Sequence, residues 1–218
     1  MNNSKKILQT AVLVSGGGTN LQALIDAEKQ MLNDTGFCPY HIALVISSAK
    51  DAFALTRAKN ANIKTFVASP SSILGIENAK TASRDEKRLA VSNKVLELCK
   101  ENNIEAIVLA GFLTVLCGKV VSEYSGKIIN LHPALLPKFG GVGMFGHHVH
   151  EAVLASNETE SGCTIHFVDD GCDTGTILLQ KKVPVLPNDT AETLYARIAP
   201  EEHKAMVEGL LLLAEKLV

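Results

Sequence analysis

The sequence has 218 residues, of which 46% are hydrophobic and 20% are charged, and its formal net charge is −2. This composition is sufficient for one sizeable hydrophobic core and excludes an intrinsically disordered chain. A net charge so close to zero, without a run of like charges, disfavours nucleic acid as a partner. The apolar run near the end, residues 209–214, is too short to span a bilayer, so we expect no membrane association.

Two further features bear on where the protein is found. Residues 1–6 are not followed by an apolar run with a cleavage site, so we expect no signal peptide. The five cysteines are an odd number without a Cys-x-x-Cys pair, which is typical of reduced thiols in a cytosolic protein. We therefore expect a cytoplasmic protein, and the sequence leaves open whether it is a monomer or a homodimer.

Apolar and amphipathic segments alternate along the first two thirds of the chain. The short apolar runs predict strands over residues 7–14, 41–47, 63–68, 105–112 and 127–132. The amphipathic segments predict helices over residues 20–30, 51–62 and 83–103. Because the strands are apolar throughout, this alternation predicts an α/β fold with an open, twisted, mostly parallel, Rossmann-like sheet and helices on both faces.

The longest of these helices, over residues 83–103, has a defined start. Ser83 with Glu86 three residues later forms a capping-box pattern. The apolar stripe expected to be buried consists of Leu89, Val95, Leu96 and Cys99. A second long helix is expected over residues 190–218, broken or kinked near Pro200.

The last third of the chain changes character. Residues 161–169 and 175–185 predict two adjacent strands joined by an acidic loop, an antiparallel pair at the edge of the sheet. Because the sequence contains no internal repeat, low-complexity tract or linker, we expect a single domain over residues 1–218. Its first half, about residues 1–110, is expected to bind phosphate or nucleotide. Its second half, about residues 111–218, is expected to carry the catalytic groups.

A glycine-rich loop, residues 15–20, leaves the first predicted strand and opens the first helix. Its three glycines allow close backbone approach, and the helix start at Thr19 and Asn20 favours an anion. The alternative is a tight turn that needs glycine only for its dihedral angles. Leu21 stands where a dinucleotide fingerprint requires glycine, and no Gly-Lys-Ser/Thr follows. The loop therefore fits a single small phosphate better than NAD or ATP.

A second candidate site lies where the strand predicted over residues 127–132 ends. Asn130 and His132 occupy alternate positions and so point to the same side of an extended chain. Pro133 and Pro137 prevent the strand from continuing. Either side chain alone would be read as structural. Together they offer an amide donor and a titratable ring at one point, as a developing oxyanion and a proton transfer require.

A third candidate is the acidic loop over residues 169–175. A carboxylate from this loop beside His132 would favour the imidazolium and fix the orientation of the ring. Spacing leaves open which of three aspartates reaches inward: Asp169, Asp170 or Asp173. The alternative is an acidic turn with a purely structural role.

A histidine cluster over residues 147–150 offers a metal-binding alternative. His147 and Glu151 are one helical turn apart. The order of a His-Glu-x-x-His motif is missing, however, and no further ligand set completes a site. We therefore expect no metal.

Four segments occur in the order and spacing of a known family: residues 15–25, 109–116, 129–137 and 162–175. In these segments the chain resembles the glycinamide ribonucleotide formyltransferases, which belong to the folate-dependent formyltransferases. The resemblance implies transfer of a formyl group from the co-substrate 10-formyltetrahydrofolate to the amino group of glycinamide ribonucleotide, in purine biosynthesis. It implies neither a metal nor a covalent enzyme intermediate.

The resemblance also implies roles for individual residues. The implied catalytic residues are Asn130, His132 and Asp173, with His166 in support. The implied ligands of the ribonucleotide are Gly18, Thr19 and Asn20 for the phosphate and Glu202 for the ribose. The implied folate-binding residues are Arg84, Leu113, Thr114, Val115, Leu116, Asp169 and Asp170. The second half of the chain is thereby expected to bind folate as well as to catalyse.

The chain departs from the family pattern in two places. Residues 139–146 are glycine-rich where Pro-Gly is usual, so we expect a mobile loop. Thr114 and Val115 replace long or basic side chains, so we expect folate contacts there to be mostly with the backbone. Two alternative functions remain: hydrolysis of 10-formyltetrahydrofolate by the same residues, and non-catalytic nucleotide binding on the same fold.

Overall fold

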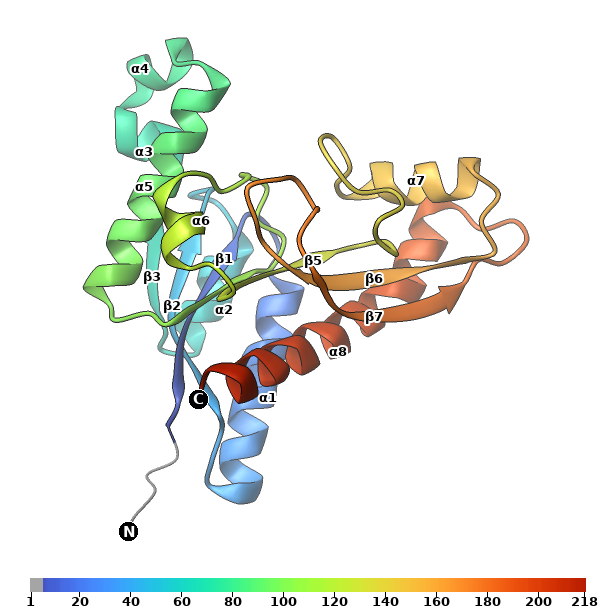
Figure 1. The fold of residues 1–218 in the computed structure, drawn as a ribbon, viewed down its shortest axis with the longest axis horizontal. Helices are drawn as coiled ribbons and strands as arrows, with labels where there is room; N and C mark the ends of the chain where they lie inside the picture. The colour runs from blue at the N-terminus through green and yellow to red at the C-terminus, as the bar shows by residue number, and fades with distance from the viewer. Residues whose placement is uncertain (1–5) are drawn as a thin grey trace.

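The computed structural model describes residues 6–218 and is organised around one sheet of seven strands (Figure 1). The strands are β1 (Leu8–Val14), β2 (Tyr40–Ser47), β3 (Lys64–Val67), β4 (Ala106–Leu109), β5 (Ile128–His132), β6 (Glu160–Phe167) and β7 (Ile177–Pro184). Their order is β3-β2-β1-β4-β5-β6-β7. The first five strands are parallel, and β6 and β7 pair antiparallel. The predicted mixed sheet is therefore confirmed. The expectation about a signal peptide rests on residues 1–6, of which all but Lys6 lie outside the described residues.

Eight helices accompany this sheet within residues 6–218. They are α1 (Thr19–Thr35), α2 (Phe53–Asn60), α3 (Pro70–Leu74), α4 (Ile76–Thr81), α5 (Arg84–Glu101), α6 (Lys119–Glu123), α7 (His147–Ala155) and α8 (Ala191–Leu217). The short helices α3, α4, α6 and α7 were not predicted, because each is too short for a helical period to stand out. None of the helices in this part of the chain is long and apolar enough to cross a membrane.

Helices pack on both faces of the sheet, as predicted. In β1, Val12 and Val14 belong to the core beneath α1 and α8, whereas Ala11 and Leu13 belong to the core beneath α5 and α6. Successive residues of a strand point to opposite faces, so a strand buried on both faces is apolar at every position. This explains why β1 shows no alternation of polar and apolar residues.

Two expectations about the helices need correction. The capping box of Ser83 and Glu86 at the start of α5 is present, but Leu89 is 47% exposed. The buried stripe is centred on Val91 and Val95, which places Leu89 at its edge. The second concerns Pro200: the helix is not broken there, since α8 runs from Ala191 to Leu217, and the expected kink stays a prediction. Buried residues before and after the proline pack on one core, which holds the helix together despite the missing N–H.

The arrangement of the sheet brings distant segments together. The carboxyl ends of β1, β4 and β5 lie at one edge, where α1 begins, and α8 packs against α1 and β6 (Figure 1). All five cysteines are unpaired in this part of the chain. The edge formed by the three strand ends is where an open parallel sheet binds ligands.

Candidate active site

A cavity of about 650 Å³ opens at the carboxyl ends of β1, β4 and β5. It is walled by the loops that follow these strands, by residues 141–147, by the β6–β7 loop and by one side of α8. Every residue that the sequence predicted for the site lines this cavity, with the exception of Asp170. Three loops far apart in the sequence therefore share one space, as predicted.

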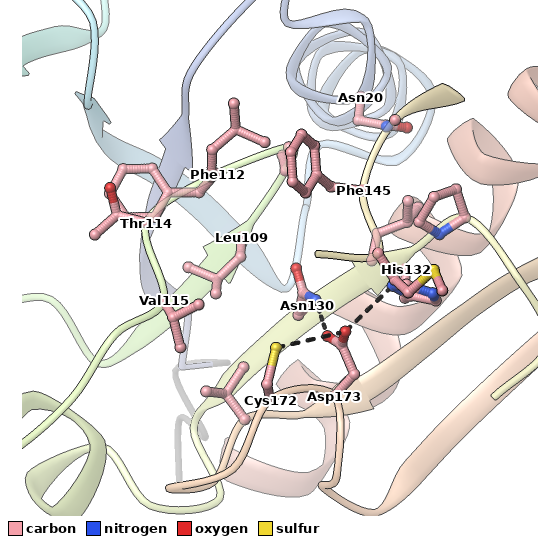
Figure 2. Close-up of a pocket in the computed structure, with 18 of the residues that line it drawn as sticks. Asn20, Leu109, Phe112, Thr114, Val115, Asn130, His132, Phe145, Cys172 and Asp173 are labelled. Carbon is pink, nitrogen blue, oxygen red and sulfur yellow. Dashed lines mark hydrogen bonds and ion pairs between the residues drawn. The ribbon is translucent and has the colours of Figure 1, made fainter. Parts of the chain in front are cut away.

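The side chains of Asn130 and His132 both point toward Asp173 (Figure 2). Asn130 Nδ2 is 3.5 Å from Asp173 Oδ1, and His132 Nδ1 is 3.5 Å from Asp173 Oδ2. His166 lies opposite Asn130 in the β5–β6 pairing, and its Nε2 is 3.0 Å from Asn130 Nδ2. Because Phe167 O lies 2.9 Å from Nδ1 of His166 and can only accept, that nitrogen carries the proton and Nε2 accepts from Asn130.

The orientation of His132 is fixed by a backbone carbonyl. Its Nε2 lies 2.7 Å from Phe139 O, so the proton of the neutral ring sits on Nε2. The other nitrogen, Nδ1, therefore faces Asp173 with its lone pair. This nitrogen is the one that can take up a proton.

The charges of this pair are set by burial and by each other. Burial lowers the pKa of His132, and the opposing effects of Asp173 and of the Phe139 carbonyl do not reverse it. Burial would raise the pKa of Asp173, but the Gly141 N–H and the positive charge that His132 carries when protonated help to hold it below its usual range. Asp173 thus favours the imidazolium, but burial outweighs this effect, so the ring is neutral at pH 7, contrary to the expectation of a charged ring.

The structure distinguishes the three aspartates that spacing could not. Asp173 contacts the catalytic pair, whereas Asp169 accepts from Gly171 N at 3.0 Å and from Thr174 Oγ1 at 2.7 Å and so shapes the loop. Asp170 is exposed and does not line the cavity, so its implied folate contact has no support from its position. Asp173 itself has a φ of 57°, in the left-handed region that aspartate tolerates better than most residues.

The structure explains the three glycines of the first loop in different ways. Gly18 has a φ of 72°, and a Cβ built on it would lie 2.6 Å from Ala54 Cβ, so the fold itself requires glycine there. Gly16 and Gly17 have no such φ, and a Cβ on either would have nothing within 4 Å. A tight turn explains Gly18 but neither of the other two. Their bare backbone lines the cavity, which favours close approach by a ligand.

The start of α1 is joined to α8 through two buried side chains. Asn20 is 9% exposed and donates from Nδ2 to Glu202 Oε2 at 3.2 Å, and Glu202 is 5% exposed. Burial raises the pKa of Glu202, and the bond from Asn20 opposes this effect. Asn20 Oδ1 has no hydrogen-bond partner among the described residues. Both residues line the cavity and carry acceptor oxygens, which suits the hydroxyl groups of a sugar.

The opposite end of the cavity is largely apolar. Its wall includes Leu109, Phe112, Thr114 and Val115 (Figure 2). The backbone carbonyls of Val115 and Leu116 already accept hydrogen bonds from an arginine side chain. Arg88, which sequence reasoning missed, donates from Nε to Val115 O at 2.7 Å and from Nη2 to Leu116 O at 3.0 Å.

Arg88 thus already engages the carbonyls of Val115 and Leu116, and the expectation of mostly backbone contacts to folate at Thr114 and Val115 stays a prediction. The available signal for Arg88 was its position one helical turn after Arg84.

The glycine-rich loop at residues 139–146 is attached to the catalytic pair at its first half. Gly141 N donates to Asp173 Oδ2 at 3.0 Å, and Phe139 O accepts from His132. The expected mobility of this loop stays a prediction for its second half, where Phe145 reaches over the cavity (Figure 2).

The histidine cluster does not assemble a set of metal ligands. Within residues 6–218, no group of three or more His, Cys, Asp or Glu residues is placed to hold a metal ion. The rings of His147 and His150 instead pack near Tyr195, with centroid distances of 6.0 and 5.6 Å.

Comparison with known proteins identifies the family to which this chain belongs. Residues 8–210 match the family model described as formyl transferase. The chain belongs to the formyl transferase family.

Its relatives within this family include enzymes of purine biosynthesis. The chain is 36% identical to phosphoribosylglycinamide formyltransferase of Haemophilus influenzae over 194 residues, which is 89% of this chain and 81% of that protein. It is 41% identical over 206 residues to the trifunctional purine biosynthetic protein adenosine-3 of Chironomus tentans. That match covers 94% of this chain but only 14% of the length of the trifunctional protein.

A solved structure of the same family confirms the fold class. Glycinamide ribonucleotide transformylase 1 from Symbiobacterium toebii superposes with a TM-score of 0.82 at 34% identity, covering 96% of this chain and 89% of that one.

Proposed function

We propose that this chain transfers the formyl group of 10-formyltetrahydrofolate to the amino group of 5-phosphoribosylglycinamide, the ribonucleotide of its relatives. One observation carries the proposal. The glycine loop, the Asn20–Glu202 pair and the cluster of Asn130, His132 and Asp173 line the same cavity. Phosphate, sugar hydroxyls and a reacting amine would thus be bound in the order in which they occur in the ribonucleotide.

The proposed reaction is direct attack of the amine on the formyl carbon. A bond forms between the amine nitrogen and this carbon while the carbonyl oxygen takes up negative charge. Asn130 donates to this oxyanion from Nδ2, in exchange for its long contact with Asp173 at 3.5 Å. The bond between the formyl carbon and N10 of the folate then breaks.

Proton transfer is assigned to His132. The attacking amine must lose a proton, and the folate N10 must gain one as it leaves. The neutral ring accepts the first proton at Nδ1, next to the Asp173 carboxylate at 3.5 Å, and the imidazolium then supplies a proton to N10. Asp173 stabilises the imidazolium during this interval, so no proton is left over.

The folate is assigned to the apolar end of the cavity. Leu109, Phe112 and Val115 offer a surface for flat rings, and Arg84 lines the same end and would attract a carboxylate. In this proposal the folate is a co-substrate and no metal takes part. The protein acts in the cytoplasm as a monomer or a homodimer.

A turnover assay with 10-formyl-5,8-dideazafolate tests the proposal. The deformylated product should appear only when the ribonucleotide is present. Product without the ribonucleotide would favour a hydrolase. No product under either condition, with the ribonucleotide still bound, would favour a non-catalytic nucleotide-binding protein.

A further inference from the structure

The ribonucleotide end of the cavity has a second wall, formed by α7 and α8. His147 and His150 from α7 and Tyr195 from α8 line it, and both histidine rings lie near the tyrosine ring. Tyr195 precedes Glu202 by two helical turns, and its pKa is raised by burial and then by the charge of Glu202. Asn20 donates a hydrogen bond to Glu202. The side chains between the start of α7 and the start of α1 are therefore neighbours in turn, from His147 through Tyr195 and Glu202 to Asn20.

This end of the cavity contains little positive charge for a phosphate. Among residues 6–218, Arg84 is the one lysine or arginine that lines the cavity, and its charge acts on the Cys172 thiol at the apolar end. Arg57 lies near the glycine loop but is already engaged. Its Nε donates to Gly17 O at 2.8 Å and its Nη1 to Gln22 Oε1 at 3.2 Å.

The first turn of α7 offers donors to the same space. Gly146 caps this nine-residue helix with a φ of 56° and without a side-chain hydrogen bond, and both Gly146 and His147 line the cavity. The helix dipole adds partial positive charge at this point. Helix starts from α1 and α7 thus border one cavity.

A buried polar atom is also left without a partner here. His150 is 1% exposed, lines the cavity, and its Nδ1 has no hydrogen-bond partner among the described residues. A buried nitrogen without a protein partner in the wall of the cavity favours a polar ligand group at this point. Burial, with smaller effects of His147 and His132, lowers the pKa of His150 to about 4, so this ring is a neutral hydrogen-bonding group. Of the two histidines of α7 that line the cavity, His147 is the exposed one.

We propose that His147 is the cationic residue that recognises the substrate phosphate, and that His150 and the first turn of α7 complete the subsite begun by α1. The inference rests on the proposed function in that it assumes a phosphorylated substrate. The groups facing His147 are Tyr195 and Glu192 on α8 and His150 on its own helix. The pKa of Glu192 is lowered mainly by its hydrogen bond with the Thr190 side chain, so its carboxylate is charged at pH 7.

Calorimetric titration with ribose 5-phosphate tests the role of His147 without requiring turnover. We expect His147→Gln to weaken binding by about 5- to 30-fold, the effect of losing one partly exposed charge-assisted hydrogen bond. His147→Lys should restore affinity to within about threefold of the wild type, because it keeps the charge. His148→Gln is the matched control, since His148 is exposed and pairs with Glu151. It should bind like the wild type.

Two results would overturn the inference: equal affinities for His147→Gln and His148→Gln, or a lysine variant as weak as the glutamine variant. Failure of the wild type to bind ribose 5-phosphate at millimolar concentration would also overturn it. The wild type could bind the probe with the expected ranking of variants and yet show no turnover with the ribonucleotide. That result would contradict the proposed function but would support the phosphate subsite.

Discussion

Nδ1 of His132 lies 3.5 Å from Oδ2 of Asp173, although the two residues are 41 positions apart in the sequence (173 − 132). The hydrogen bond of Nε2 to Phe139 O directs the lone pair of Nδ1 toward the carboxylate. A neutral ring in this position has an unfavourable contact that protonation converts into an ion pair. The pair is thereby suited to hold a proton for the duration of a reaction step.

Removing the charge of Asp173 should abolish most of the proposed turnover. We expect Asp173→Asn to lower kcat about 10²- to 10³-fold, because the imidazolium loses its counter-ion. The pKa of His132, already below its ordinary value, should fall further. NMR titration of His132 together with turnover checks both effects.

Asp170→Asn is the matched control for that substitution, since the side chain is exposed in the same loop. It should change neither the turnover nor the titration of His132. Loss of activity in Asp170→Asn with full activity in Asp173→Asn would show that the assignment within this loop is wrong.

The neighbouring glycines of the first loop should respond differently to alanine. Gly18→Ala should lower the free energy of unfolding by about 2–4 kcal/mol, through its left-handed φ and the close contact with Ala54. Gly17→Ala should leave stability within about 0.5 kcal/mol and raise the KM for the ribonucleotide about tenfold, because its Cβ would stand where phosphate approaches. Urea denaturation and steady-state kinetics measure the two effects. A Gly17→Ala enzyme with unchanged KM would speak against the phosphate assignment.

Acid should destabilise the fold in part through His150. Its folded pKa of about 4 lies below the ordinary value of 6.5, so its contribution to stability is complete above pH 6.5 and is lost as the pH falls toward 4. Between pH 7 and pH 5 the expected loss from this residue is about 1–2 kcal/mol. Urea denaturation at both pH values should show a smaller loss for His150→Gln than for the wild type. An undiminished pH dependence in that variant would rule out this contribution.

Chelation should leave the proposed activity unchanged. The reacting carbonyl has Asn130 and His132 as its partners, and the rings of His147 and His150 pack near Tyr195. Turnover after prolonged dialysis against EDTA should equal that of the untreated enzyme. A loss of rate that zinc restores would identify a metal site that involves these histidines.

The features that sequence alone could predict are those governed by local periodicity. Residues 11–14 of β1 are all apolar because the strand is buried on both faces, and Asn130 and His132 share a side because strands alternate. The short helix α7 was missed, and Leu89 was wrongly placed in the core, because both depend on tertiary packing.

The charges of the site residues and their contacts with one another could not be predicted from the sequence either. The neutral state of His132 depends on burial, and the contacts of Arg88 with the carbonyls of Val115 and Leu116 depend on how α5 is placed. Spacing left three aspartates open, and the resemblance pointed to Asp173, which is the one that the fold brings to His132. Long-range contacts of this kind carry no signal in the spacing of one chain.

The destination of the formyl carbon tests the central claim most directly. With 10-formyltetrahydrofolate labelled with 13C at the formyl group, NMR can follow this carbon in the presence and absence of 5-phosphoribosylglycinamide. We predict that the label moves to the formamide of the ribonucleotide when that substrate is present, and that it stays on the folate when it is absent. Release of the label as formate at the same rate with and without the ribonucleotide would contradict the proposed transfer.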